Sequence, residues 1–295
     1  MGGPACPGVQ GVDAPAARAR PQAPRGARQE YGAMRPDFSL LDRPHILAFM
    51  FYPRPDWSPP PAGAEDLTIP VAEGVTLSAR LYTGDRDWPV ILLFHGNGEV
   101  VADYDGIAPL YHRHGLNLLV VDYRGYGRSG GRPTFTAIHA DAHAVKTATF
   151  AHLDASGYQA GRYLMGRSLG ALPAVELAAT DADGFRGLII ESGAAGVRGW
   201  SRFAAPGDDR AAWQALEAAQ RARLASITLP LLTIHGAWDE LVPLERALEA
   251  HETNGSEDKE LVIIPDAGHN DLLARGLEQY FQALTRFVAR HERRS

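Results

Sequence analysis

Cysteine is almost absent from this sequence of 295 residues, in which Cys6 is the only example. One thiol cannot close a disulfide within the chain, and a reducing compartment suits such a protein best. Long apolar runs are absent as well, because the longest candidate, "HILAFMFY" at residues 45–52, is much shorter than the roughly 20 residues that cross a bilayer. The sequence therefore predicts a cytoplasmic protein without stable membrane insertion.

Positive charge is also in short supply, since the formal net charge is −6 at neutral pH. The first 35 residues hold five Arg, one Asp and one Glu, so a charge of −9 remains on residues 36–295. This balance argues against a nucleic-acid surface. Residues 1–35 are rich in Ala, Gly, Pro and Arg and lack the apolar core of a secretory signal, so we expect a disordered tail followed by one domain over residues 36–295.

Beyond the tail, short apolar runs alternate with helical patterns. Residues 66–82, "DLTIPVAEGVTLSARLY", indicate two strands joined at "EG". Six later runs are nearly continuous and rich in β-branched residues, as in strands buried on both faces: 89–96, 116–125, 161–168, 186–193, 229–236 and 259–269. We therefore expect an α/β fold, with a mostly parallel central sheet flanked by helices and ligands bound beyond the carboxyl ends of the strands.

Residues 162–173, "RYLMGRSLGALP", place a serine between two glycines at the end of one predicted strand. A G-x-S-x-G sequence on a sharp turn from strand to helix pushes the serine Oγ out above the sheet, and the glycines let strand and helix pass closely. The alternative is a glycine-containing loop in which Ser168 caps the helix. Because the helical pattern "ALPAVELAAT" follows directly, we interpret Ser168 as a nucleophile.

A serine hydroxyl needs a base that accepts its proton, and this base needs a carboxylate that orients it. His269 follows the last predicted strand in "PDAGHND", whereas His235 in "TIHGAWDELVP" is interpreted as a structural residue at a strand end. Asp239 lies in the loop after run 229–236 and gives the chain order serine, acid, histidine. Glu191 ends an earlier strand, keeps the same order and remains the alternative acid.

Attack on a carbonyl places negative charge on its oxygen, so two fixed N–H donors are needed. We predict the backbone N–H groups of Leu169, directly after the serine, and of Asn97 in "HGNGE", for which an ordinary tight turn is the alternative. His139 and His143 in "HADAH" have a spacing that could hold a metal, but no third ligand is evident, and the pattern favours a solvated helix face. The predicted chemistry needs no cofactor and no metal.

Five motifs in order, "FHGNGE", "VVDYRGYGRSGG", "GRSLG", "HGAWDELVP" and "GHND", resemble the serine α/β-hydrolases, and within them the Bem46-like branch that includes depalmitoylating enzymes. The resemblance extends over residues 68–287. It implies an α/β-hydrolase fold and assigns the nucleophile, the acid, the base and the two oxyanion donors to Ser168, Asp239, His269, Asn97 and Leu169.

The resemblance implies a serine hydrolase that cleaves carboxylic esters or thioesters of a small-molecule acyl substrate. Residues 194–228 stand where this fold inserts a cap, and they contain Trp200, Phe203 and Trp213, which either line an apolar pocket or simply pack in the core. The short length of this cap predicts short-to-medium acyl chains. The alternatives are a serine aminopeptidase-like peptidase, a protein depalmitoylase and a non-catalytic ligand-binding member of the fold. Depalmitoylating relatives carry an N-terminal cysteine cluster for membrane attachment, whereas Cys6 stands alone here.

Overall fold

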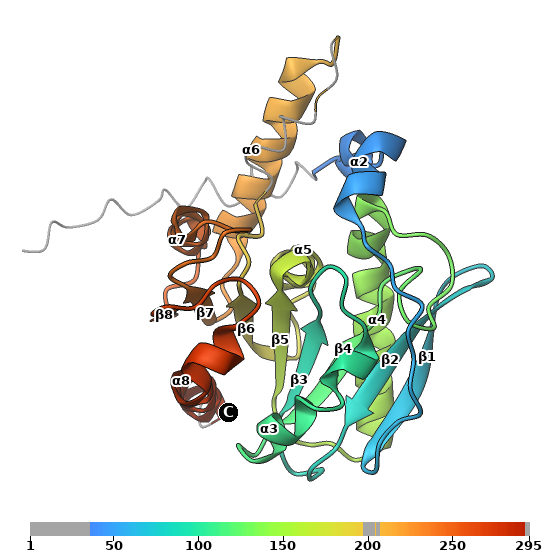
Figure 1. Cartoon of the computed structure of the whole chain (residues 1–295), viewed down its shortest axis with the longest axis vertical. Helices are drawn as coiled ribbons and strands as arrows, with labels where there is room; N and C mark the ends of the chain where they lie inside the picture. The colour runs from blue at the N-terminus through green and yellow to red at the C-terminus, as the bar shows by residue number, and fades with distance from the viewer. Residues whose placement is uncertain (1–35, 197–203, 205–206, 293–295) are drawn as a thin grey trace, which may run out of the picture.

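The computed structural model describes residues 36–196, 204 and 207–292. In this part of the chain, eight strands form one sheet in the order β1-β2-β4-β3-β5-β6-β7-β8 (Figure 1). The strands are β1 (Ala64–Ala72), β2 (Val75–Tyr82), β3 (Val90–Phe94), β4 (Asn117–Val121), β5 (Arg162–Arg167), β6 (Phe185–Glu191), β7 (Leu231–Gly236) and β8 (Lys259–Ile264). Strand β2 is antiparallel to β1 and β4, and the other neighbouring pairs are parallel. The predicted hairpin and the mostly parallel sheet are confirmed.

Helices cover both faces of this sheet. They are α2 (Pro44–Met50), α3 (Ala108–His112), α4 (Phe135–Ala155), α5 (Ala171–Thr180), α6 (Arg210–Ser226), α7 (Leu244–Thr253) and α8 (Leu272–Glu292), with short 3-10 helices η1 (Phe38–Leu41), η2 (Val101–Tyr104) and η3 (Ser168–Gly170). Successive side chains of a strand point to opposite faces. Along β3, Leu92 and Phe94 join an apolar cluster with α2, α4, α5 and α6, whereas Ile91 and Leu93 join a second cluster with α3 and α8.

Strand β8 departs from the expected burial on both faces. It is the last strand of the sheet, and five of its six residues are half-buried, with Ile264 alone buried. An edge strand has a neighbouring strand on one side only, so its side chains stay partly accessible. The run at residues 259–269 therefore predicted a strand that the structure has over Lys259–Ile264, and its predicted burial was wrong.

The parallel strands all end on the same side of the molecule, where α2 and α6 also lie. Figure 1 shows the arrows of β3 and β5 pointing toward these two helices. Helix α6 falls within the predicted cap segment, but its Trp213 is 2% exposed and belongs to the same apolar cluster as Phe38. This side chain packs in the core instead of lining an acyl pocket. The predicted tail, Trp200 and Phe203 lie outside the described residues.

Within the described part of the chain, no helix combines the length and the apolarity needed to cross a membrane.

Candidate active site

Ser168 lies on a sharp turn between strand β5 and helix α5. It begins η3 and has a φ of 50°, in the left-handed region that non-glycine residues rarely adopt. A Cβ atom on Gly166 would lie 2.4 Å from the carbonyl oxygen of Gly170, and one on Gly170 would lie 1.9 Å from that of Phe94. Both positions therefore require glycine, because the strand, the turn and the end of β3 come together here.

The alternative interpretation of Ser168 as a helix cap is wrong. The N-cap position of α5 is taken by Gly170, and no side chain caps this helix by a hydrogen bond. The hydroxyl of Ser168 instead lies 2.9 Å from Nε2 of His269. The local backbone thus directs the serine side chain toward the loop after β8.

His269 and Asp239 meet beside this serine. Nδ1 of His269 lies 2.8 Å from Oδ2 and 3.0 Å from Oδ1 of Asp239, and both residues are buried. The two loops that carry them follow the neighbouring strands β8 and β7, which places them at the same edge of the sheet. The three side chains predicted from their chain order therefore form one continuous hydrogen-bonded line.

The environment of Asp239 favours its charged form. Burial by itself would raise the pKa of this carboxyl, but the hydrogen bond from His269 and the N–H group of Val242 outweigh burial and hold the pKa below its usual range. Oδ1 accepts hydrogen bonds from the N–H groups of Leu241 and Val242 at 3.0 and 2.7 Å. A fixed carboxylate of this kind orients an imidazole and stabilises its protonated form.

The predicted structural role of His235 agrees with its contacts. It lies in β7, fully buried, with Nε2 2.9 Å from the carbonyl oxygen of Val242 and 3.4 Å from Oδ2 of Asp239. Burial lowers the pKa of its imidazole. His235 thus supports the loop that carries the proposed acid, and its Nε2 approaches the same oxygen, Oδ2 of Asp239, that contacts Nδ1 of His269.

Glu191, the alternative acid, has other partners. It ends β6, where Oε2 accepts a 2.7 Å hydrogen bond from the hydroxyl of Tyr280 and Oε1 accepts one from Nε of Arg167 at 3.2 Å. Burial raises the pKa of this carboxyl. The carboxylate in contact with His269 is that of Asp239.

The two predicted oxyanion donors lie on segments that adjoin each other. Leu169 follows the serine within η3, and the loop with Asn97 follows β3, whose last carbonyl oxygen packs against Gly170. The side chain of Asn97 is used elsewhere: Oδ1 accepts hydrogen bonds from the N–H group of Tyr52 and the hydroxyl of Tyr126, and Nδ2 donates to Met50. These contacts fix the loop, and the donor role of the two backbone N–H groups stays a prediction.

A charged network beside His269 was not predicted from the sequence. The guanidinium of Arg167 contacts the carboxylates of Glu99 and Glu191, and Nη2 donates to the carbonyl oxygen of His269 at 3.2 Å and to Oδ1 of Asn270 at 3.0 Å. Burial by itself would lower the pKa of Arg167, but the two carboxylates hold it above its ordinary value. "GRSLG" contains Arg167 and "HGNGE" contains Glu99, but no sequence pattern pairs two residues that are 68 positions apart.

A cavity of about 250 Å³ adjoins this network. Its lining combines charged and aromatic side chains with His269, and includes Glu99, Asp103, Tyr104, Arg167, Glu191 and Leu272. The cavity thus lies next to the proposed base and between the segments that follow β3 and β8.

The sequence predicted that His139 and His143 lie on a solvated face of α4. The structure shows that this prediction is wrong for His139. His139 is buried, its ring stacks on Phe38 with centroids 3.7 Å apart, and Nδ1 lies 2.6 Å from the carbonyl oxygen of Phe135. His143 is partly exposed and lies 3.3 Å from Glu176. Core packing of α4 against η1 explains the first histidine.

Sequence comparisons agree with this architecture. The family described as serine aminopeptidase, S33, matches residues 87–215. Protein Rv2307c of Mycobacterium tuberculosis is 30% identical over 222 residues, which cover 72% of this chain and 74% of that protein. The human alpha/beta hydrolase domain-containing protein 17B is 29% identical over 204 residues, which cover 68% of this chain and 66% of that protein.

Solved structures share the fold. Esterase Pf2001 of Pyrococcus furiosus has a TM-score of 0.60 and 23% identity, covering 78% of this chain and 93% of that chain. Est1E of Butyrivibrio proteoclasticus, solved with ferulic acid bound, has a TM-score of 0.62 and 21% identity. The match covers 76% of this chain and 98% of that chain. With the mycobacterial relative and the family match, these likenesses show that the chain belongs to the α/β-hydrolase superfamily.

Proposed function

We propose that this protein is a serine hydrolase that cleaves carboxylic esters or thioesters of short-to-medium acyl chains through an acyl-enzyme at Ser168. The observation that carries the proposal is the line of contacts from Ser168 Oγ through His269 to Asp239, at 2.9 and 2.8 Å. This is the arrangement in which a neutral imidazole accepts the proton of a hydroxyl as that hydroxyl attacks. Membership in a hydrolase superfamily supports the same conclusion.

The proposed reaction has two halves. In the first, Nε2 of His269 accepts the hydroxyl proton while Oγ of Ser168 bonds to the substrate carbonyl carbon, and Asp239 stabilises the imidazolium through Nδ1. The backbone N–H groups of Asn97 and Leu169 donate to the oxyanion. His269 then gives its proton to the leaving alcohol or thiol, and the acyl group stays on the serine oxygen.

In the second half, water takes the place of the alcohol. His269 accepts a proton from the water as its oxygen attacks the acyl carbonyl, and the carboxylic acid leaves as Ser168 regains its proton. Every step transfers a proton or an acyl group between the substrate, water and these side chains. The proposed reaction therefore needs no cofactor.

The proposed acyl length is supported by the space beside His269. We propose that the acyl chain enters the cavity of about 250 Å³, which is lined by His269 but not by Ser168 and is smaller than the roughly 300–1,000 Å³ of typical small-molecule sites. Charged groups in its lining limit the apolar surface that an acyl chain can contact. A buried methylene adds about 0.8 kcal/mol of binding, or about fourfold in efficiency, but only until the pocket is full. We propose that segment 194–228 acts as a short cap that limits acyl length further.

A panel of p-nitrophenyl esters of graded acyl length, run on the wild type and Ser168→Ala together, tests the proposal. We expect kcat/KM to rise over the first few acyl carbons and then level off or fall, and Ser168→Ala to lose at least about a thousandfold in kcat. Wild-type rates in Ser168→Ala would refute the serine mechanism. A steady rise to palmitoyl esters would refute the short-chain preference and favour the depalmitoylase alternative.

A peptidase is the second candidate, because the matching family is described as serine aminopeptidase. The same three side chains can cleave an amide if the substrate is held correctly. Aminoacyl p-nitroanilides assayed beside the esters separate the two candidates. Faster hydrolysis of the anilides by the wild type than by Ser168→Ala, with negligible ester turnover, would replace the esterase proposal.

A further inference from the structure

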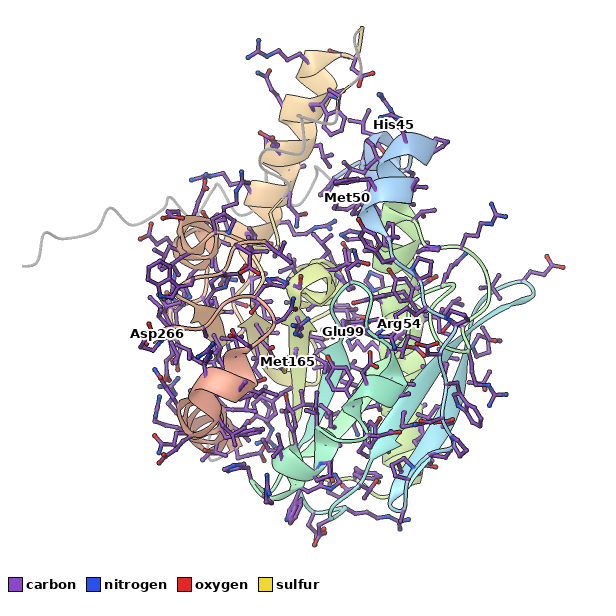
Figure 2. The ribbon with its side chains drawn as sticks, viewed as in Figure 1. His45, Met50, Arg54, Glu99, Met165 and Asp266 are labelled. Carbon is purple, nitrogen blue, oxygen red and sulfur yellow. The ribbon has the colours of Figure 1, made fainter. Side chains whose placement is uncertain are left out.

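The side chain of Arg167 extends from the residue before the nucleophile across the edge of the sheet. Tyr163 and Met165, four and two positions earlier in β5, belong to the apolar cluster with α3 and α8. Alternation along the strand therefore sends Arg167 to the same face. Figure 2 labels Glu99 and Met165 in this part of the molecule, where β3 and β5 end. The guanidinium is thus held between the loops that follow β3 and β8.

On one side, Arg167 holds the loop after β3 through Glu99. Oε1 of Glu99 contacts Nη1 of Arg167, and Oε2 accepts hydrogen bonds from the N–H group of Gly96 at 2.9 Å and from the hydroxyl of Tyr104 at 2.8 Å. Gly96 directly precedes Asn97, the proposed oxyanion donor. The carboxylate therefore links the guanidinium to the backbone that carries this donor.

On the other side, Arg167 holds the backbone of the proposed base. Nη2 donates to the carbonyl oxygen of His269 and to Oδ1 of Asn270. Asp239 fixes the imidazole ring of His269, and hydrogen bonds of the Ala267 carbonyl oxygen and the Gly268 N–H group hold the preceding part of this loop. The bond from Arg167 to the carbonyl oxygen of His269 adds a restraint on the main chain of the proposed base itself.

The planar guanidinium is the group that can make these bonds together. Nε contacts Glu191, Nη1 contacts Glu99, and Nη2 contacts the loop after β8, so donors in one rigid plane reach three separate segments. The side chain is 13% exposed, so water replaces few of these bonds. A lysine ammonium keeps the charge but presents its donors at one atom and cannot span the same partners.

We propose that Arg167 is a positioning residue that sets the separation between the oxyanion loop and the general base. The inference rests on the proposed function, because it assigns Arg167 a part in the same acyl transfer. A displacement of about 1 Å between reacting groups can cost about 100-fold in rate, even when the substrate still binds. Loss of the guanidinium should therefore lower kcat much more than it changes KM.

Arg167→Lys is the first test, with Arg286→Lys as the matched control. Arg286 lies on α8, is exposed and pairs with Glu260. Glu260 is near the start of β8, the end of this strand opposite to the loop with His269. We expect Arg167→Lys to unfold cooperatively like the wild type and to lose about 100-fold in kcat toward the preferred ester with KM little changed. The control should keep the wild-type kcat. Wild-type kcat in Arg167→Lys, or a loss confined to KM, would overturn the inference.

Chemical rescue is the second test. Arg167→Ala leaves space next to the cavity of about 250 Å³, where free guanidinium can bind between Glu99 and Glu191. Millimolar guanidinium chloride should raise the kcat of this variant by about tenfold, whereas urea, which has the same planar shape without charge, should not. Equal responses to both compounds would contradict the proposed role. If Arg167→Ala does not fold, Arg167→Lys decides.

The two proposals fail in different ways. A wild type that neither hydrolyses esters nor reacts with a fluorophosphonate refutes the proposed function, and the role of Arg167 with it. A wild type that does both, alongside an unimpaired Arg167→Lys, refutes the role of Arg167 alone.

Discussion

Ser168 Oγ and His269 Nε2 lie 2.9 Å apart although 101 positions separate the two residues in the chain. Their approach follows from the sheet, because parallel strands present their carboxyl ends, and the loops that follow, on one side. Ser168 follows β5, and His269 follows β8, three strands along the sheet. The loop after β8 therefore has to reach back over β6 and β7, and the contacts of His269 with Asp239 and Arg167 hold it there.

The choice of Asp239 as the acid predicts unequal effects of two amide substitutions. Asp239→Asn keeps a carbonyl oxygen for the N–H groups of Leu241 and Val242 but presents an NH₂ group to His269, which favours the wrong tautomer. We expect a loss of about 10⁴ in kcat. Glu191→Gln is the matched variant and should lose far less, because its carboxylate contacts Arg167 and Tyr280 instead of the base. A larger loss in Glu191→Gln, measured on the same ester, would show that the acid is misassigned.

Gly170→Ala should destabilise the fold. A Cβ atom at this position would lie 1.9 Å from the carbonyl oxygen of Phe94, and backbone cannot move away as a side chain can. We expect a loss of about 1–3 kcal/mol or more in the free energy of unfolding, as for other overpacked sites. Gly106→Ala is the control, since a Cβ atom there meets nothing within 4 Å. Urea unfolding curves that coincide for the two variants would contradict this account of the turn.

His139 should make the protein less stable in acid. Burial lowers the pKa of its imidazole to about 3, against an ordinary value of 6.5. Between these values the unfolded chain binds a proton here and the folded protein does not, so stability decreases as pH falls, by up to about 1.4 kcal/mol per pH unit.

His139→Phe removes this titration and keeps a ring that can stack on Phe38. The free energy of unfolding, measured by urea titration between pH 8 and pH 4, should therefore decrease less steeply below pH 6.5 in His139→Phe than in the wild type. Parallel curves for the two proteins would show that His139 does not carry this part of the acid sensitivity.

The fold could be predicted because its signals are local. Six strands are short apolar runs, and the turns of the hairpin and at Ser168 contain glycine. The hairpin, the order of elements and the turn at Ser168 therefore follow from neighbouring residues. The chain order of Ser168, Asp239 and His269 also predicted which side chains the sheet brings together. Burial was less predictable: β8 has the composition of a central strand but lies at the edge, and His139 has a polar side chain but stacks on Phe38.

The network around Arg167 could not be predicted for a different reason. Its partners lie in the loops after β3 and β8 and at the end of β6, and their pairing depends on the distances between these loops in the folded protein. A charged residue next to the proposed nucleophile has no periodicity that shows where its side chain points. Only the packed sheet edge reveals that one guanidinium contacts both loops.

Covalent labelling tests the central claim most directly. The folded wild type is incubated with a fluorophosphonate, and intact mass and peptide mapping count and locate the adduct. A nucleophile activated by His269 and Asp239 predicts one adduct per chain, on Ser168, which is absent from Ser168→Ala and slowed in Asp239→Asn. No adduct on the folded wild type, or an adduct on another residue that persists in Ser168→Ala, would contradict the account.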